Sequence, residues 1–376
     1  MIKFIFKKTT FFILKVVFLI FAIYCFLVLD NYSRFRTEYQ VKNSNATKIL
    51  LVWGKGLGES EQTHRFKIAA RRLGIELKTV SEFGGYLDTF VPRRSVRAAN
   101  AMQPDFVLTI ERKIEPIPGF VNYLVLDQSQ DYYLTMEIDN QLKFINPMHY
   151  TFDGLLPTFQ QIDRLQKTYE MSGKKFHGFL WYPTLYQTDY VAQKPLRLFY
   201  PGGTLADETR SSKKYKRVFM LLDRTGYLDL FGSKEKWEHT PNSFRGMIPF
   251  DGISLIKEHN KAGVALVLHA NDHLYGGLPT GRIFEAAAAN TVIIADQNPF
   301  LMKHFANNIL YVDTSEDFKQ IFKQIDDHMQ WIFSHPDQAQ QMAQNCHQIF
   351  LQKFTLEAQL QQLIDLHKTR EASHLL

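Results

Sequence analysis

Apolar and polar positions alternate with two different periods along the 376 residues of this chain. Short apolar runs of strand length, closed by glycine, proline or asparagine, alternate with longer stretches in which apolar residues recur every three or four positions. Near-continuous apolar strands separated by helices are typical of parallel sheets that are covered on both faces. The pattern therefore predicts an α/β protein.

The alternation of predicted strands and helices occurs in two successive series, with a break at Gln193-Lys194-Pro195. Before the break we expect strands at 48–53, 106–110, 123–126 and near 176–181, with helices at 60–73, 94–102 and 158–171. After it we expect strands at 196–200, 227–231, 264–268, 292–295 and 309–312, with helices at 211–223, 253–260, 282–289, 315–333, 336–350 and 355–368. We predict two Rossmann-like doubly wound domains, 47–193 and 194–352, with a carboxyl-terminal helical segment, 353–376. Such domains bind ligands in the cleft beside their carboxyl-end loops.

The first thirty residues have a different pattern. Residues 11–29 are apolar except for Lys15, and about 20 apolar residues cross a bilayer. Bulky residues at 25–29 do not resemble a signal-peptidase site. We predict an uncleaved transmembrane helix, with residues 1–30 as the membrane anchor and 31–46 as a polar linker. A buried core helix is the alternative, and the basic residues on the two flanks nearly balance, so the orientation stays open.

The composition limits the classes of binding partner that we expect. A formal net charge of +6 and a pI near 9.0 suit a membrane surface or an anionic ligand. The basic residues are dispersed and no aromatic-basic module occurs, so we do not expect nucleic-acid binding. Cys25 lies within the predicted anchor and Cys346 far from it, which fits a chain without a structural disulfide. The loop "GKGLGES" at 54–60 lacks both the dinucleotide spacing and the lysine-serine ending of a phosphate loop.

A second glycine loop follows the strand at 196–200. Gly202 and Gly203 allow a close backbone approach, and Arg210 and Lys214 lie where the next helix begins. Backbone amides, the helix dipole and cations together favour a phosphate there. A plain turn before a solvated helix is the alternative.

The stretch "PTGRIFEAAAANTVIIAD", residues 279–296, carries the other candidate site. A glycine-rich turn delivers Arg282 and Glu285 to the cleft at the start of a short, alanine-rich helix. An arginine can fork onto phosphate oxygens, and a carboxylate can accept two ribose hydroxyls. In the alternative, Glu285 only complements the helix dipole. Asn290 is expected to end this helix in a left-handed cap.

The segments "FYPGG", "LFGSKEKW", "FRGMIPFDG" and "GRIFEAAAANTVIIAD", in this order and spacing, resemble the carboxyl half of GT-B glycosyltransferases. The resemblance covers Leu196 to about Phe354 and is strongest to the group that includes the spore-maturation-protein-like enzymes. It implies a nucleotide-diphospho-sugar held mainly by the second domain and an acceptor bound mainly by the first. It also implies that the last helix crosses back onto the first domain, and that no cofactor is needed besides this co-substrate.

The resemblance also implies roles for individual residues. Glu285 would hold the ribose, and the backbone of 246–248 would meet the base. The implied donor-binding residues are Gly202, Gly203, Arg210, Lys214, Gly246, Met247, Ile248, Gly281, Arg282 and Glu285. Many relatives have another glutamate eight positions before Glu285, where this chain has Gly277.

Because of that departure, Asp272 or His273 is expected to substitute for the missing glutamate, and His273 joins Arg282 and Glu285 as a candidate catalytic residue. Fixed cations and amides would stabilise the departing diphosphate, so no metal is required. His269, Asp272 and His273 have a spacing that a metal could use, but no further ligand is evident. A general base from the first domain would be one of Glu59, His64, Asp153 and His177, which the sequence does not rank.

These expectations describe a membrane-anchored, hexosyltransferase-like glycosyltransferase that moves a sugar to a glycan, a lipid-linked or a protein acceptor. Nucleotide sugars are made in the cytosol, so the catalytic part is expected on the cytoplasmic side of a bacterial inner membrane, in polysaccharide biosynthesis. A lumenal, Golgi-type placement is the alternative for a eukaryotic source. A non-catalytic sugar- or nucleotide-binding protein, or a membrane-bound interaction scaffold with the same two lobes, are the alternative functions.

Overall fold

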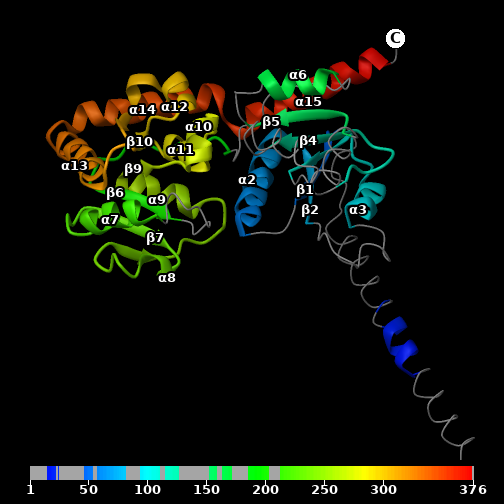
Figure 1. Cartoon of the computed structure of the whole chain (residues 1–376). Coiled ribbons are helices and arrows are strands. Elements are labelled where there is room, and N and C mark those ends of the chain that lie inside the picture. The colour runs from blue at the N-terminus through cyan, green and yellow to red at the C-terminus, as the bar shows by residue number, and fades with distance from the viewer. Residues whose placement is uncertain are drawn as a thin grey trace, which may run out of the picture.

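The computed structural model describes residues 15–22, 24, 46–53, 57–81, 94–110, 115–126, 152–158, 163–171, 185–202 and 212–374. Two sheets, each made of parallel strands, lie side by side, and each has its own helices (Figure 1). The predicted α/β class and the two doubly wound units are therefore confirmed for the described residues.

The first sheet has the strand order β2-β1-β3-β4-β5, and every described pairing in it is parallel. Its elements are β1 (Lys48–Trp53), α2 (Leu57–Leu73), β2 (Glu76–Ser81), α3 (Arg94–Met102), β3 (Phe106–Thr109), β4 (Asn122–Leu126), β5 (Gly154–Pro157) and α6 (Asp163–Met171). The first strand of the chain is thus internal, with a neighbour on each side.

The second sheet has the order β11-β10-β9-β6-β7-β8 and is parallel as well. Its elements are β6 (Arg197–Gly202), α7 (Lys213–Leu222), β7 (Leu228–Gly232), α8 (Lys234–Trp237), β8 (Phe244–Gly246), α9 (Ser254–Ala262), β9 (Gly263–Val267), α10 (Asn271–Gly276), α11 (Gly281–Ala288), β10 (Val292–Asp296), α12 (Pro299–His304), the 3-10 turn η3 (Ala306–Asn308), β11 (Leu310–Val312), α13 (Phe318–Ser334), α14 (Pro336–Lys353) and α15 (Leu356–His374).

Alternation along the strands assigns each face of the second sheet to a helix layer. Ala265 and Val267 of β9 share one buried cluster with α9 and α11. Val264 and Leu266 of the same strand belong to another, with α7 and α13. Successive side chains of a strand point to opposite faces. Both faces are therefore covered, which explains why the strands read as continuous apolar runs.

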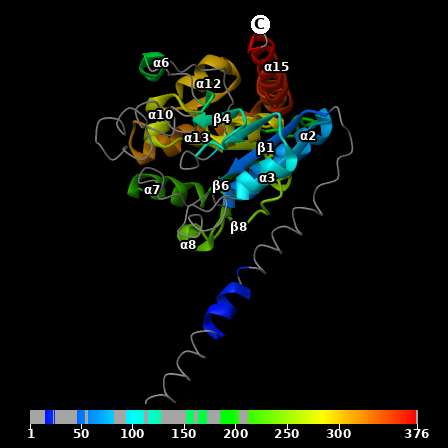
Figure 2. The ribbon, with the colours of Figure 1, turned by 90° about the vertical axis from the view of Figure 1, so that its right-hand side faces the viewer.

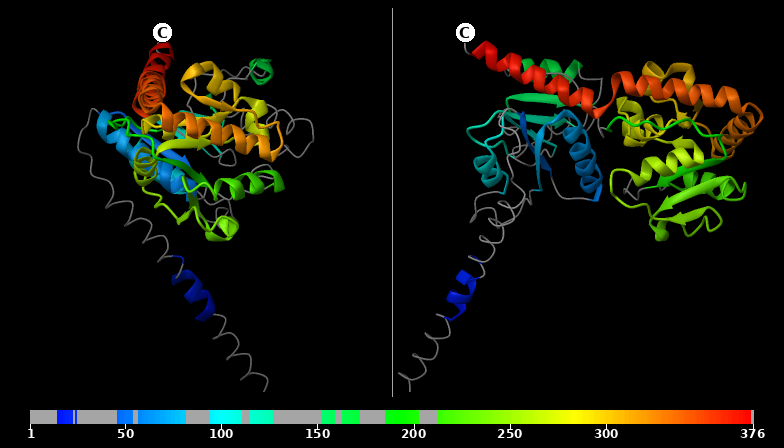
Figure 3. Two further views of the ribbon diagram at one scale, coloured as in Figure 1. Left: turned by 90° about the vertical axis from the view of Figure 1, so that its left-hand side faces the viewer. Right: turned by 180° about the vertical axis from the view of Figure 1, so that it is seen from behind.

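The two domains share part of their apolar core. The cluster that holds α9 and α11 continues into strand residues of the first sheet and into α2 and α15. After α14 lies over the second domain, α15 runs along the first domain and packs on α2 (Figure 3). In Figure 2, where the first domain faces the viewer, α15 passes above β4 and β1.

Polar contacts fix α15 and the connecting segment in this arrangement. In α15, Arg370 Nη2 donates to Asp153 Oδ1 at 2.8 Å, and Tyr123 Oη lies 3.3 Å from His367 Nδ1. Where the chain crosses between the domains, the backbone N–H of Leu356 donates to the carbonyl of Leu185 at 2.7 Å. The two crossings of the chain therefore lie side by side.

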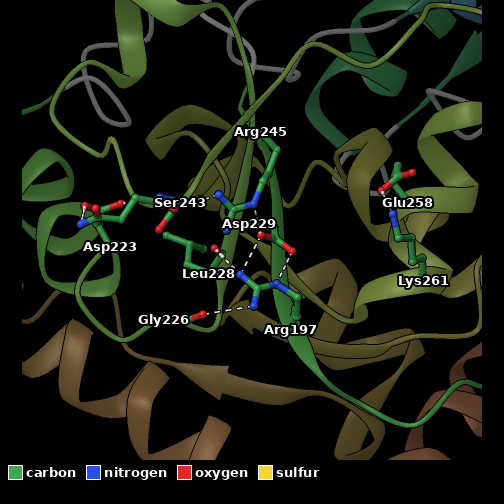
Figure 4. A network of polar contacts seen from close by, with 10 residues as sticks. Arg197, Asp223, Gly226, Leu228, Asp229, Ser243, Arg245, Glu258 and Lys261 are labelled. Carbon is green, nitrogen blue, oxygen red and sulfur yellow. Dashed lines mark hydrogen bonds and ion pairs between the residues drawn. The ribbon is translucent and has the colours of Figure 1, made fainter.

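A partly buried carboxylate links three neighbouring strands of the second sheet, β6, β7 and β8 (Figure 4). Asp229 of β7 pairs with Arg197 of β6 and, at 2.6 Å, with Arg245 of β8. Nη1 of Arg197 also donates to the carbonyl of Gly226 at 3.1 Å. Among the described strands, β8 lies at the edge of the sheet with β7 as its neighbour, and the contact of Arg245 with Asp229 adds a side-chain link between these two strands.

Several elements differ from the sequence expectations. β2, β5 and β8 were not predicted, because two are edge strands with mixed polar composition and "GLLP" of β5 is short and ends in proline. Of the helix expected at 158–171, the structure describes α6 at Asp163–Met171, and residues 159–162 lie outside the described residues. The strand expected near 176–181 lies outside the described residues.

Of the membrane helix expected at 11–29, the structure describes only residues 15–22 and 24, which are helical and exposed. Within the part of the chain that the structure describes, no helix is both long enough and apolar enough to cross a bilayer.

Candidate functional site

The candidate site lies where the strand order of the second sheet reverses. From β6 the chain adds β7 and β8 on one side, then returns to place β9 on the other. Doubly wound sheets bind ligands outside the carboxyl ends of the two strands at such a switch point. Here these ends are Gly202 of β6 and Val267 of β9.

Arg282 is positioned at this switch point. Its Nε donates to the carbonyl of Pro201 at 2.8 Å, and its guanidinium lies 5.5 Å from the ring centroid of Tyr200. Residue 282 is the second of α11, whose N-cap Thr280 makes no side-chain capping bond. The first turn of α11 and the guanidinium thus meet the end of β6, an arrangement that favours an anion.

Glu285 lies one turn further along α11 and faces the first domain. Its Oε1 accepts a hydrogen bond from Arg65 Nη2 of α2 at 2.8 Å. The same nitrogen donates to Glu61 Oε1 at 2.8 Å, and Glu61 Oε2 accepts from the backbone N–H of Gly252 at 2.8 Å. A buried network therefore joins the two domains through the carboxylate that was predicted to hold ribose.

The charges in this network are buried, and the pKa of Glu61 responds to them. Burial raises the pKa of Glu61, and Glu285 raises it further, against the opposing effects of Arg65 and the Gly252 N–H. Nearby on α9, His259 is fully buried, and burial together with Arg282 and Arg65 lowers its pKa to about 3. His259 is therefore neutral at physiological pH.

Gly202 serves packing at the end of β6. A Cβ on this residue would lie 2.2 Å from Cζ2 of Trp237. The indole packs edge-on against Phe219, with ring centroids 4.9 Å apart. The sequence interpretation assigned this glycine to a ligand, and the structure shows that an indole already occupies the adjacent space. Its predicted donor contact stays a prediction.

The remaining predicted donor residues are spread around the second domain. Lys214 Nζ donates to the carbonyl of Thr314 at 2.7 Å. Gly246 ends the edge strand β8 with a φ of 106°, Met247 after it is 63% exposed, and Ile248 is partly buried.

Gly281 begins α11 beside Arg282. His273 lies on α10, and its backbone carbonyl accepts from the N–H of Leu278 at 2.9 Å. Gly203 and Arg210 lie outside the described residues, and so does the side chain of Asp272.

The Gly277 departure and the expected cap at Asn290 both have backbone explanations. Gly277, where relatives have a glutamate, ends α10 with a left-handed φ of 61°, which favours glycine. Asn290 has a φ of 56°, so the expected left-handed cap is confirmed. Its Nδ2 donates to the carbonyl of Tyr190 at 2.9 Å, a bond to the interdomain segment that glycine could not make.

The base candidates of the first domain are differently placed. Asp153 is engaged with Arg370 and with the backbone N–H of Asn122. His64 is exposed on α2. His177 and the side chain of Glu59 lie outside the described residues. Among the described residues, no three side chains of the metal-ligating types gather in one place.

Sequence reasoning missed Arg65 and Glu61, and it named His269 only as a possible metal ligand, without its partner Asp296. His269, just after β9, lies with Nδ1 2.7 Å from Asp296 Oδ1, and its backbone N–H donates to the same carboxylate. The only signal for Arg65 was its spacing of four from Glu61 on a helix, which is common on solvated faces. Its partner Glu285 is 220 positions away, so no local pattern could reveal it.

Comparisons with known proteins agree with this fold. Residues 216–365 match the family described as "Glycosyl transferase-like". Sucrose-phosphate synthase from Thermosynechococcus elongatus superposes with a TM-score of 0.53 and 11% identity, over 87% of this chain and 100% of that one.

A glycosyltransferase from Rickettsia africae gives a TM-score of 0.51 at 11% identity, over 86% and 98% of the two chains. Anabaena HepE, solved with UDP-glucose, gives 0.52 at 11% identity, over 86% and 99%. None of the curated protein sequences is significantly similar to this chain. The fold is therefore that of the GT-B glycosyltransferases, and residues 216–365 match a glycosyl transferase-like family model, in agreement with the resemblance seen in the sequence.

Proposed function

We propose that this chain transfers a sugar from a nucleotide-diphospho-sugar to a hydroxyl of a glycan, lipid-linked or protein acceptor. The donor lies at the switch point of the second domain, and the acceptor enters from the first domain. HepE was solved with UDP-glucose, which supports uridine-diphosphate sugars as the first donors to test.

One observation carries the proposal. Arg282 lies against the end of β6, and Glu285, one turn further along the same helix, faces the other domain. A guanidinium suits the oxygens of a diphosphate, and a carboxylate suits the hydroxyls of a ribose. One short helix thus presents both groups that a sugar nucleotide requires.

In the reaction, the bond between the anomeric carbon and the β-phosphate oxygen breaks, and the nucleoside diphosphate leaves with the electron pair. The acceptor oxygen forms the new bond to the anomeric carbon and releases its proton to a base. Negative charge grows on the departing diphosphate, so Arg282 and the amino end of α11 stabilise the transition state more than the ground state. His273, on the preceding helix, is the candidate for contact with the donor sugar.

The proposal includes a single-pass membrane anchor at residues 11–29, because that run is apolar except for Lys15. We place the catalytic part on the cytoplasmic side, where nucleotide sugars are made, with a polysaccharide or lipid-linked glycan as its product.

Turnover tests the activity. The full chain in detergent is incubated with UDP-, GDP-, ADP- and dTDP-sugars, and release of the nucleoside diphosphate is measured with and without glycan and lipid acceptors. We expect release with one nucleotide class. Binding without release would instead identify a non-catalytic sugar-nucleotide-binding protein. The absence of both binding and release would refute the proposal.

Glu285→Gln tests the site. Arg65 keeps Glu61 as its counter-ion in this variant, so no unpaired buried charge remains. Hydrogen bonds to a charged group contribute about 1.5–3 kcal/mol, so donor affinity should fall by about 10- to 100-fold. Glu357→Gln is the matched control, because Glu357 accepts from Arg72 of the same helix α2. Unchanged calorimetric affinity for Glu285→Gln would remove the assignment.

A further inference from the structure

Arg65 is a buried cation of the first domain that reaches the candidate site of the second. It is 0% exposed, and its Nη2 donates to both Glu61 and Glu285 at 2.8 Å. Its Nε and Nη1 are buried and have no hydrogen-bond partner among the described residues. A guanidinium with only one of its three nitrogens satisfied is costly if its role is only to fasten two domains.

The contact leaves Glu285 partly available. The side-chain hydrogen bonds that the described residues give Glu285 go through Oε1. A carboxylate has about four acceptor positions on its two oxygens. Arg65 therefore fixes the rotation of the carboxylate, and the described side chains leave Oε2 and the second lone pair of Oε1 to a ligand.

Arg65 also separates two buried carboxylates. Glu61 and Glu285 approach the same guanidinium nitrogen, so without Arg65 these carboxylates would repel each other. A carboxylate that holds two hydroxyls must present acceptor positions on both oxygens, so its rotation decides whether both hydroxyls can bind.

We propose that Arg65 is a positioning residue that orients the carboxylate of Glu285, so that the second domain recognises the ribose of the donor only with the first domain in place. This inference rests on the proposed function, because it takes Glu285 as the ribose ligand.

A second arginine on the same helix shows what a fastening pair looks like. Arg72 donates to Glu357 Oε1 at 2.9 Å and to the carbonyl of Gln187, and its side chain is 45% exposed. Solvated pairs of this kind contribute little. Arg72 therefore provides a matched control, with the same residue type, helix and class of partner but no contact with Glu285.

The test measures discrimination between ribose and 2′-deoxyribose. Calorimetry gives the Kd of the full chain in detergent for UDP and dUDP, and for GDP and dGDP. Loss of one hydrogen bond to a carboxylate should weaken the deoxy form by about 10- to 100-fold in the wild type. In Arg65→Met the two forms should bind within about 3-fold of each other, because the carboxylate has lost the hydrogen bond that orients it. Arg72→Met should keep the wild-type ratio.

Arg65→Met leaves two buried carboxylates and can impair folding. The double variant Arg65→Met/Glu61→Gln removes that repulsion and should fold, yet it should still fail to discriminate. Arg65→Lys keeps a cation but not the fork, so it should restore only part of the ratio.

The outcomes separate the two claims. If folded Arg65→Met/Glu61→Gln discriminates as well as the wild type, the role of Arg65 is refuted and the proposed function stands. If the wild type binds no nucleoside diphosphate, or binds ribose and deoxyribose forms equally, ribose recognition by Glu285 fails, and the role of Arg65 fails with it.

Discussion

Gly202→Ala is the sharpest test of the packing at the end of β6. The added Cβ would lie 2.2 Å from Cζ2, 2.8 Å from Cε2 and 3.0 Å from Nε1 of Trp237. Carbon atoms of different residues attract best at about 3.5–4.0 Å, so the indole or the strand must move by more than an ångström.

The indole has little room to yield. It is 9% exposed and is surrounded by Tyr200 and Phe219, with ring centroids 5.9 Å and 4.9 Å away. Overpacking in such a cluster costs about 1–3 kcal/mol. We expect Gly202→Ala to lower the free energy of unfolding by that amount and to change the tryptophan fluorescence of the folded state.

Urea denaturation of a double-mutant cycle measures the effect. In a Trp237→Leu background the clash is absent, and alanine should be neutral or stabilising by about 0.4–1 kcal/mol, because it restricts the unfolded chain. The same destabilisation in both backgrounds would refute the reasoning, since the cost would then not come from the indole.

Three further predictions concern other parts of the second domain. Asn290→Ala should destabilise the protein by about 2 kcal/mol, because alanine is strained at a φ of 56° and cannot make the hydrogen bond to the carbonyl of Tyr190. Asn290→Gly should cost less, because glycine adopts this φ without strain. Thermal melts compare the two variants. Asp229→Asn should cost about 1–2 kcal/mol by weakening the links to Arg197 and Arg245, and a urea midpoint equal to the wild type would contradict this. Burial lowers the pKa of His259 from 6.5 to about 3, so between these pH values the unfolded chain binds more protons than the folded protein. The stability of the protein therefore falls as the pH drops from about 6.5 toward 3. His259→Leu should reduce this pH dependence, and thermal melts at pH 5 and pH 7.5 measure it.

Local pattern sufficed for most of the framework. Residues 49–53 and 292–295 are apolar and buried, and each run lies in a strand whose bounds are within a residue of the prediction. Such strands can be predicted from the sequence because a parallel sheet covered by helices on both faces requires apolar residues at nearly every position. Edge strands such as β2 and β8 bury only part of their surface, so their residues carry no comparable signal.

The sequence by itself determined that Arg282 and Glu285 begin a short helix after a glycine turn and that Asn290 ends it, because caps, turns and helix periodicity depend on neighbours in the chain. Only the tertiary structure decided that Glu285 shares Arg65 with Glu61 and that Gly202 makes room for Trp237. Contacts between residues far apart in the sequence depend on how the two sheets and α15 pack together, and no pattern within one segment encodes that packing.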